Sequence, residues 1–182
     1  KGSIAGTSSI LVEIIRWCAY AALFAPLVVH PSFFFPFVVP KAVFFWIFAE
    51  IMFFTWLLLA IPNKQFRPSG NPLSLAVGLF LLITIFTSFT GMNIERSFWS
   101  TFERMAGTIN WIHLGIFFLV LISTFKNIAD WKKLMSTSFI VASIVSAVFL
   151  LEKVGISILP FESRNGATIG NSSFMAAYLL FN

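Results

Sequence analysis

The chain has 182 residues, of which 58% are hydrophobic and only 10% are charged, and its formal net charge is +5 at pH 7. A soluble domain carries about a quarter charged residues, so this composition excludes an ordinary water-soluble protein. The positive charge does not indicate a nucleic-acid partner, because the basic residues are spread over short segments and the longest basic cluster is Lys132-Lys133.

The apolar residues lie in long continuous runs, which predict an all-α, polytopic membrane helix bundle surrounded by the lipid bilayer. We expect a polar tail over residues 1–9 and one membrane domain over residues 10–182. The predicted spans, in chain order, are residues 10–29, 42–61, 73–89, 108–125 and 134–151, with the start of a sixth, incomplete span at residues 171–182.

The first predicted span, residues 10–29, holds Glu13 and Arg16 three positions apart and therefore on one face of the helix. Pro26 is expected to kink or end this helix. The next segment, residues 30–41, is rich in proline and phenylalanine. Its prolines exclude a regular helix and its phenylalanines exclude a solvated loop, so we predict a segment that lies in the headgroup region.

Glu50 sits near the middle of the second predicted span, where a lone carboxylate costs about 2.5 kcal/mol or more unless it is paired or neutral. If the first two spans are antiparallel neighbours, Arg16 differs from it in depth by roughly 7 Å, which a snorkelling arginine covers. We therefore predict an intramembrane pair of Glu50 and Arg16. This pair could be purely structural, or it could line a translocation path. A protonated Glu50 that is hydrogen-bonded to another neighbour is a further alternative.

The distribution of Lys and Arg predicts the orientation of the bundle. The amino-terminal tail and the second and fourth connections between the predicted spans hold Lys1, Lys64, Arg67, Lys126, Lys132 and Lys133, opposed by Asp130. The other connections hold Lys41, Arg96, Arg104, Lys153 and Arg164, interleaved with Glu95, Glu103, Glu152 and Glu162. The nearly unopposed first set favours a cytoplasmic amino terminus, which places the second set on the outer side of the membrane.

One outward segment, residues 93–107, mixes Glu-Arg pairs with aromatic residues at helical spacing, so we expect a short amphipathic surface helix. Arg96 and Arg104 are of the residue type that holds a phosphate or diphosphate through bidentate hydrogen bonds. Anchoring of the segment to the membrane interface by its aromatic residues is the alternative.

A second outward segment, residues 164–171, joins Arg164 to a glycine-bearing turn at the start of the sixth span. Gly170 allows the backbone to approach a ligand closely, and free amides at a helix start favour anions. Asn171 is expected to cap the following helix. The alternative is that this segment is only a capped helix start with a flexible approach.

The two histidines, His30 and His113, both lie at predicted helix mouths, where they suit either acid–base chemistry or a structural hydrogen bond. The spacing of residues indicates no metal-ligand pair, nucleophile elbow, phosphate-binding glycine loop or carboxylate dyad. We therefore expect no metal and no cofactor, and residue spacing alone indicates no complete catalytic set.

Arg96–Met105 (RSFWSTFERM) and Arg164–Asn171 (RNGATIGN) resemble segments of the bacterial O-antigen ligase and O-antigen polymerase family, which includes O-oligosaccharyltransferases. The run Pro31–Glu50 and the sequence DWKK at Asp130–Lys133 are similar to this family as well. The resemblance covers most of the chain from about Arg16 onward and concerns the amino-terminal portion of the family. One departure is Ser-Ser after the Asn171 position, where the family often has Pro-Asn.

This resemblance implies an all-helical, multi-pass protein of the bacterial inner (cytoplasmic) membrane. It implies transfer of a glycan from an undecaprenyl-diphosphate carrier to a lipid, glycan or protein acceptor on the outer face, without a metal. Arg164 corresponds to a diphosphate-side arginine, with Arg96 and Arg104 behind it. In the family, the histidine that serves as the catalytic base belongs to a large outward loop that comes later than residue 182, so no catalytic histidine is assigned here.

Two rival functions stay open from the sequence. One is a transporter or channel subunit, in which Glu50 and Arg16 line a path across the membrane. The other is a non-catalytic membrane scaffold.

Overall fold

The computed structural model describes residues 2–101, 103–156, 159 and 166–182, and the side chains from residue 8 onward within these ranges. The regular secondary structure of this part of the chain is helical, which confirms the predicted all-α class. The α-helices are α1 (Gly2–Ala22), α2 (Val39–Ala60), α3 (Pro72–Thr90), α4 (Ile94–Trp99), α5 (Thr108–Thr124), α6 (Ile128–Lys153) and α7 (Ser172–Leu180). Short 3-10 helices are η1 (Ala25–Leu27), η2 (Lys64–Phe66) and η3 (Ala167–Ile169).

Within the described residues, four helical segments are long and apolar enough to cross a membrane: Ser8–Leu27, Val39–Ala60, Pro72–Thr90 and Ile128–Lys153. Helix α5, which was predicted as a complete span, has 17 residues. At 1.5 Å per residue it rises about 26 Å, which is less than the roughly 30 Å hydrocarbon core of a typical bilayer. The structure therefore supports four of the five predicted complete spans by length and composition.

Helix boundaries follow from prolines and caps. Helix α1 gives way to η1, which has Pro26 in its first turn, and α2 begins with Pro40 in its first turn. At the start of α3, the Asn71 side chain accepts a hydrogen bond of 2.7 Å from the Ser74 amide. Proline lacks an amide hydrogen, so it is tolerated in a first turn but interrupts a helix that reaches it from the amino-terminal side.

The start of α6 differs from its prediction. The basic segment before residue 134 was expected to be a loop, but the helix begins at Ile128 and takes in the sequence DWKK. Asp130 lies in the first turn, where a carboxylate is favoured by the positive end of the helix dipole. A loop assignment based on charge alone was therefore wrong here.

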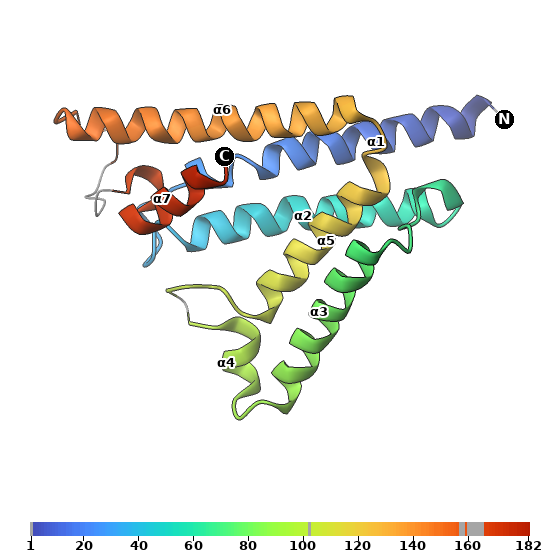
Figure 1. Ribbon diagram of the computed structural model, residues 1–182, viewed down its shortest axis with the longest axis horizontal. Helices are drawn as coiled ribbons and strands as arrows, with labels where there is room; N and C mark the ends of the chain where they lie inside the picture. The colour runs from blue at the N-terminus through green and yellow to red at the C-terminus, as the bar shows by residue number, and fades with distance from the viewer. Residues whose placement is uncertain (1, 102, 157–158, 160–165) are drawn as a thin grey trace.

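Helices α1, α2 and α6 run side by side along the long axis of the molecule, and α3 and α5 cross them at an angle (Figure 1). Helix α2 packs on α1 and on α5, and α5 also packs on α3. Ile15, Met52, Leu59 and Val120 are fully buried where these helices meet. Gly115 of α5 lies directly against the Leu81 side chain of α3, since a Cβ atom there would collide with it. Small residues permit such close approach between apolar helices.

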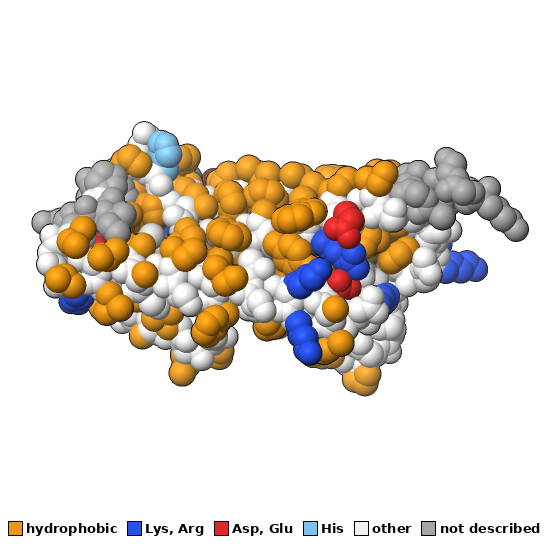
Figure 2. Space-filling model, turned by 90° about the horizontal axis from the view of Figure 1, so that it is seen from above, with side chains coloured by type: hydrophobic (Ala, Val, Ile, Leu, Met, Phe, Trp, Pro, Cys, Tyr) orange, Lys and Arg blue, Asp and Glu red, His pale blue; other side chains and the backbone are white. Residues whose placement is uncertain are grey.

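The connecting segments gather at two opposite ends of the helices. Residues 28–38, 100–107 and 166–171 lie toward one end, and the amino terminus and residues 61–71 lie toward the other (Figure 1). Large hydrophobic side chains cover the outward faces between the ends, including Phe54, Leu58, Leu82, Ile83, Phe86 and Phe139. On the face shown in Figure 2, hydrophobic side chains are widespread and charges of both signs gather in one patch toward the amino-terminal end.

Candidate functional site

Three segments that are far apart in the sequence line an open cavity of about 470 Å³ at the end of the helices that holds residues 28–38. Its walls are residues 35–38, the pair Glu103 and Arg104, and residues 169–171 together with Phe174. We refer to these as the first, second and third walls. The cavity brings together three of the predicted ligand-binding residues, Arg104, Gly170 and Asn171.

The first wall belongs to the irregular segment between η1 and α2. The chain there makes turns instead of a regular helix, as its prolines predicted, and the His30 amide donates to the Pro36 carbonyl over 3.3 Å. Phe34 is 92% exposed at its tip, whereas Phe37 is half-buried against the third wall. The aromatic residues thus provide both an exposed apolar tip and an apolar side of the cavity.

The third wall is a glycine turn that leads into α7. Gly170 has φ +83°, in the left-handed region, and a Cβ atom on it would lie 2.8 Å from Cδ1 of the Phe37 ring. Glycine is therefore needed both for the backbone conformation and for the contact between the walls. The Asn171 side chain accepts a hydrogen bond of 2.9 Å from the Ser173 amide, which confirms its predicted role as the helix cap.

The second wall comes from the loop that follows α4. Asn93 caps α4 by accepting from the Arg96 amide over 2.9 Å, and the helix ends at Trp99. The predicted surface helix is therefore shorter than its aromatic spacing indicated, and Phe102 lies outside the described residues. The Arg104 amide donates to the Thr101 carbonyl over 3.0 Å, so Arg104 is carried by a turn beyond the helix.

Hydrogen bonds at the two ends of this loop hold it against the helices below it. The Ser88 and Thr108 hydroxyls bond to each other, and the Thr108 hydroxyl also donates to the Ser97 carbonyl over 3.2 Å. Gly107 lies so close to the Phe98 carbonyl that a Cβ atom would collide with it. The loop thus starts and ends at adjacent points above α3 and α5.

Of the other two predicted ligand-binding arginines, Arg96 lies elsewhere and Arg164 lies outside the described residues. Arg96 lines a different cavity of about 420 Å³, formed within its own loop by residues 93–105. Arg104 is therefore the arginine that the described part of the chain places beside Gly170 and Asn171.

Lys41 is a residue of this region that the sequence reading did not assign to the site. It lies in the first turn of α2, and its Nζ donates to the Phe37 carbonyl over 2.8 Å and to the Thr168 carbonyl over 2.6 Å. A lysine directly after Pro40, at the mouth of a span, was visible in the sequence. Its second acceptor was not, because Thr168 is 127 positions later in the chain.

The predicted pair of Glu50 and Arg16 is corrected by the structure. Glu50 Oε1 lies 3.1 Å from Nε2 of His113 in α5, not against α1. The other ring nitrogen, Nδ1, is 2.7 Å from the Ile109 carbonyl. Because a carbonyl only accepts, Nδ1 carries a hydrogen, and Nε2 and Glu50 share a further one between them.

Two further side chains hold the His113 ring in this orientation. The Trp46 ring stacks on it with centroids 5.0 Å apart, and Trp46 Nε1 donates to the Asn110 side chain over 3.1 Å. His113 is buried, while the Glu50 side chain is 57% exposed. Glu50 thus connects a buried imidazole to the surface of α2.

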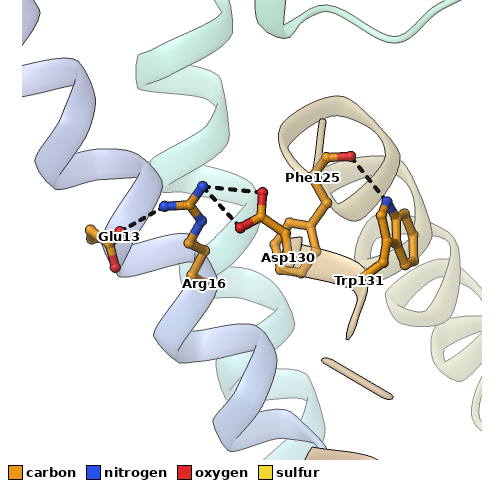
Figure 3. A network of polar contacts seen from close by, with 5 residues as sticks. All are labelled: Glu13, Arg16, Phe125, Asp130 and Trp131. Atoms are coloured by element: carbon orange, nitrogen blue, oxygen red, sulfur yellow. Dashed lines mark hydrogen bonds and ion pairs between the residues drawn. The ribbon is translucent and has the colours of Figure 1, made fainter. Parts of the chain in front are cut away.

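Arg16 forms its ion pairs elsewhere, with Glu13 on its own helix at 2.7 Å and with Asp130 of α6 at 3.1 Å. Figure 3 shows the guanidinium between the two carboxylates, and the Trp131 indole donating to the Phe125 carbonyl beside them. Asp130 is buried, and it reaches Arg16 because α6 begins at Ile128. The early start of α6 therefore supplies a partner for Arg16 that the predicted loop did not.

The described lining of the cavity combines aromatic side chains, Arg104, Glu103 and a capped helix start, which suits the anionic head group of an amphiphilic ligand. Among the described residues, His, Cys, Asp and Glu side chains form no group of three or more that could hold a metal ion. Comparison of the chain with protein-family models, with curated proteins and with solved structures found no match.

Proposed function

We propose that the chain works in a bacterial inner-membrane glycan transferase that moves a glycan from an undecaprenyl-diphosphate carrier to a lipid, glycan or protein acceptor. The observation that carries this proposal is the meeting of Arg104 with Gly170 and Asn171 on one cavity with aromatic walls. All three walls include residues of segments whose sequences resemble the O-antigen ligase and polymerase family.

Arg104 is the group that binds the carrier diphosphate in this proposal. A guanidinium forms bidentate, charge-assisted hydrogen bonds to phosphate oxygens, and these strengthen as negative charge develops on the leaving group. The amides at the start of α7 add partial positive charge at the same cavity. Phe37 and Phe174 give the cavity apolar sides, which suit the lipid end of the carrier. Together these groups position the donor and stabilise its departing diphosphate.

The proposal includes an orientation with the amino terminus in the cytoplasm, so the cavity opens on the outer face of the membrane. It also treats α5 as a fifth span. A helix about 26 Å long is accommodated by local thinning of the bilayer, at a cost of fractions of a kcal/mol per Å of mismatch. The nearly unopposed basic residues at the opposite end, among them Lys64, Arg67 and Lys126, support this orientation.

The test is glycan transfer in cells that depend on the full-length protein. Arg104→Ala and Arg164→Ala, each produced at the wild-type level in the membrane, are expected to lower transfer at least tenfold. Lys126→Ala removes one positive charge at the opposite end of the helices and serves as the matched control. Wild-type transfer by Arg104→Ala would remove this arginine from the mechanism.

A second candidate is a transporter or channel subunit, and the pair of Glu50 and His113 is the observation that favours it. A carboxylate in the middle of α2 that shares a proton with a buried imidazole provides a step for proton movement within the membrane. This function predicts proton flux into proteoliposomes that is lost in Glu50→Gln. The transferase proposal predicts no such flux and normal glycan transfer by the same variant.

A further inference from the structure

Lys41 makes a connection between two walls of the cavity through a single ammonium group. One acceptor, the Phe37 carbonyl at 2.8 Å, belongs to the first wall. The other, the Thr168 carbonyl at 2.6 Å, belongs to η3, the 3-10 helix whose last residue, Ile169, begins the third wall. The ammonium also lies 5.7 Å from the centroid of the Phe37 ring. Three contacts of one side chain thus concentrate on the junction between the walls.

No carboxylate pairs with Lys41 among the described residues; its polar partners there are the two carbonyl oxygens. A desolvated ammonium is costly when only neutral dipoles compensate its charge, and an apolar side chain of similar length would avoid that cost. A positive charge in this position therefore needs an explanation other than packing. An anion in the adjacent cavity provides one.

The charges that line the cavity point the same way. Glu103 and Arg104 are the charged residues among its described lining, and their formal charges cancel. Lys41 contacts Phe37, which lines the cavity, and adds a positive charge that no carboxylate of the described residues pairs with. Without Lys41 the formal charges of these described side chains would sum to zero.

The bond from Lys41 to Thr168 is also a polar link between α2 and the segment that leads into the glycine turn. Thr168 is buried, yet its hydroxyl makes no hydrogen bond within the described structure. Close contact of Gly170 with the Phe37 ring then sets the distance between the walls. The lysine holds the third wall against the first, and the glycine determines how near the two can come.

We propose that Lys41 is a positioning residue that joins the first and third walls and supplies the net positive charge that makes the cavity an anion site. The joining of the walls is independent of the function proposed above. The identity of the anion as a diphosphate head group rests on that function.

The wall contact is measured by chemical cross-linking in the full-length protein in membranes. The single native cysteine is replaced by Cys18→Ser, and Val38→Cys and Ile169→Cys place one thiol on each wall. We expect a short bismaleimide to cross-link this pair efficiently, Lys41→Met to lower the yield at least threefold, and Lys41→Arg to restore it. Equal yields with Lys41→Met and with lysine would overturn the positioning role.

The charge is measured by binding of inorganic pyrophosphate to the purified full-length protein in nanodiscs. Lys41→Met is expected to weaken binding at least tenfold, since the attraction between unit charges as far as about 12 Å apart corresponds to a tenfold effect at an effective dielectric constant of about 20. Lys41→Arg is expected to stay within about threefold of wild type, and Lys126→Met, at the opposite end, serves as the control for charge. Unchanged affinity in Lys41→Met, or equal loss in Lys41→Arg, refutes the assigned charge role.

The experiments distinguish failure of the role assigned to Lys41 from failure of the proposed transferase function. Loss of cross-linking and of pyrophosphate binding in Lys41→Met, alongside normal glycan transfer in Arg104→Ala, keeps the inference and rejects the function. Normal cross-linking and binding in Lys41→Met, alongside loss of transfer in Arg104→Ala, keeps the function and rejects the inference.

Discussion

Gly170→Ala tests the contact between the first and third walls. An L-residue in the left-handed region costs about 1–2 kcal/mol, and overpacking a filled site costs a further 1–3 kcal/mol or so. Both apply at Gly170, whose φ is +83° and whose added methyl group would meet the Phe37 ring 2.8 Å from Cδ1. The free energy of unfolding of the full-length protein is therefore expected to fall by about 2–5 kcal/mol. The measurement is denaturant unfolding in detergent–lipid mixtures, followed by tryptophan fluorescence.

Gly155→Ala is the matched control, because Gly155 has φ +90° and nothing within 4 Å of the position of an added methyl group. It carries the backbone cost alone and is expected to lose only about 1–2 kcal/mol. A double-mutant cycle with Phe37→Ala is expected to give a coupling energy of about 1–3 kcal/mol, since removal of the ring relieves the collision. Equal losses in the two glycine variants, with no coupling to Phe37, would refute the close contact between the walls.

Two further predictions concern the ion pairs. Asp130→Ala leaves the half-buried Arg16 with its exposed partner Glu13, so the free energy of unfolding is expected to fall by up to about 3 kcal/mol. Glu13→Gln is expected to lower it by less than about 1 kcal/mol, because that pair is exposed to solvent. Equal losses for the two variants in chemical denaturation would contradict the assignment of Asp130 as the main partner. Glu50→Leu leaves Nε2 of the buried His113 without a partner and is expected to cost about 1–3 kcal/mol, while the Glu50→Gln amide still donates to Nε2 and costs less than about 1 kcal/mol. Equal unfolding midpoints of the two Glu50 variants would show that this hydrogen bond does not stabilise the packing of α2 on α5.

Much of the fold was readable from the sequence because continuous apolar runs determine where membrane-length helices form. The expected spans at residues 42–61 and 73–89 differ from α2 and α3 only at their ends. The start of α6 was not readable from charge, because Lys132 and Lys133 are compatible with a helix as well as with a loop. The length of α5 depends on where the loop before it folds back, which is a tertiary property.

The candidate site was predictable as a set of residue types but not as an arrangement. Arg104, Gly170 and Asn171 were candidates from local chemistry, and the turn at Gly170 and the cap at Asn171 depend only on neighbouring residues. Which segments meet depends on the packing of helices far apart in the sequence. For the same reason Lys41 was missed, and Glu50 was given the wrong partner.

The most direct test of the central claim is binding of undecaprenyl diphosphate to the full-length protein in nanodiscs. We expect saturable binding by the wild type and by Lys126→Ala. We expect Arg104→Ala to bind about 10- to 100-fold more weakly, since a charge-assisted hydrogen bond contributes about 1.5–3 kcal/mol. Equal affinity of the wild type and Arg104→Ala for this lipid would contradict the assignment of the cavity as a diphosphate site.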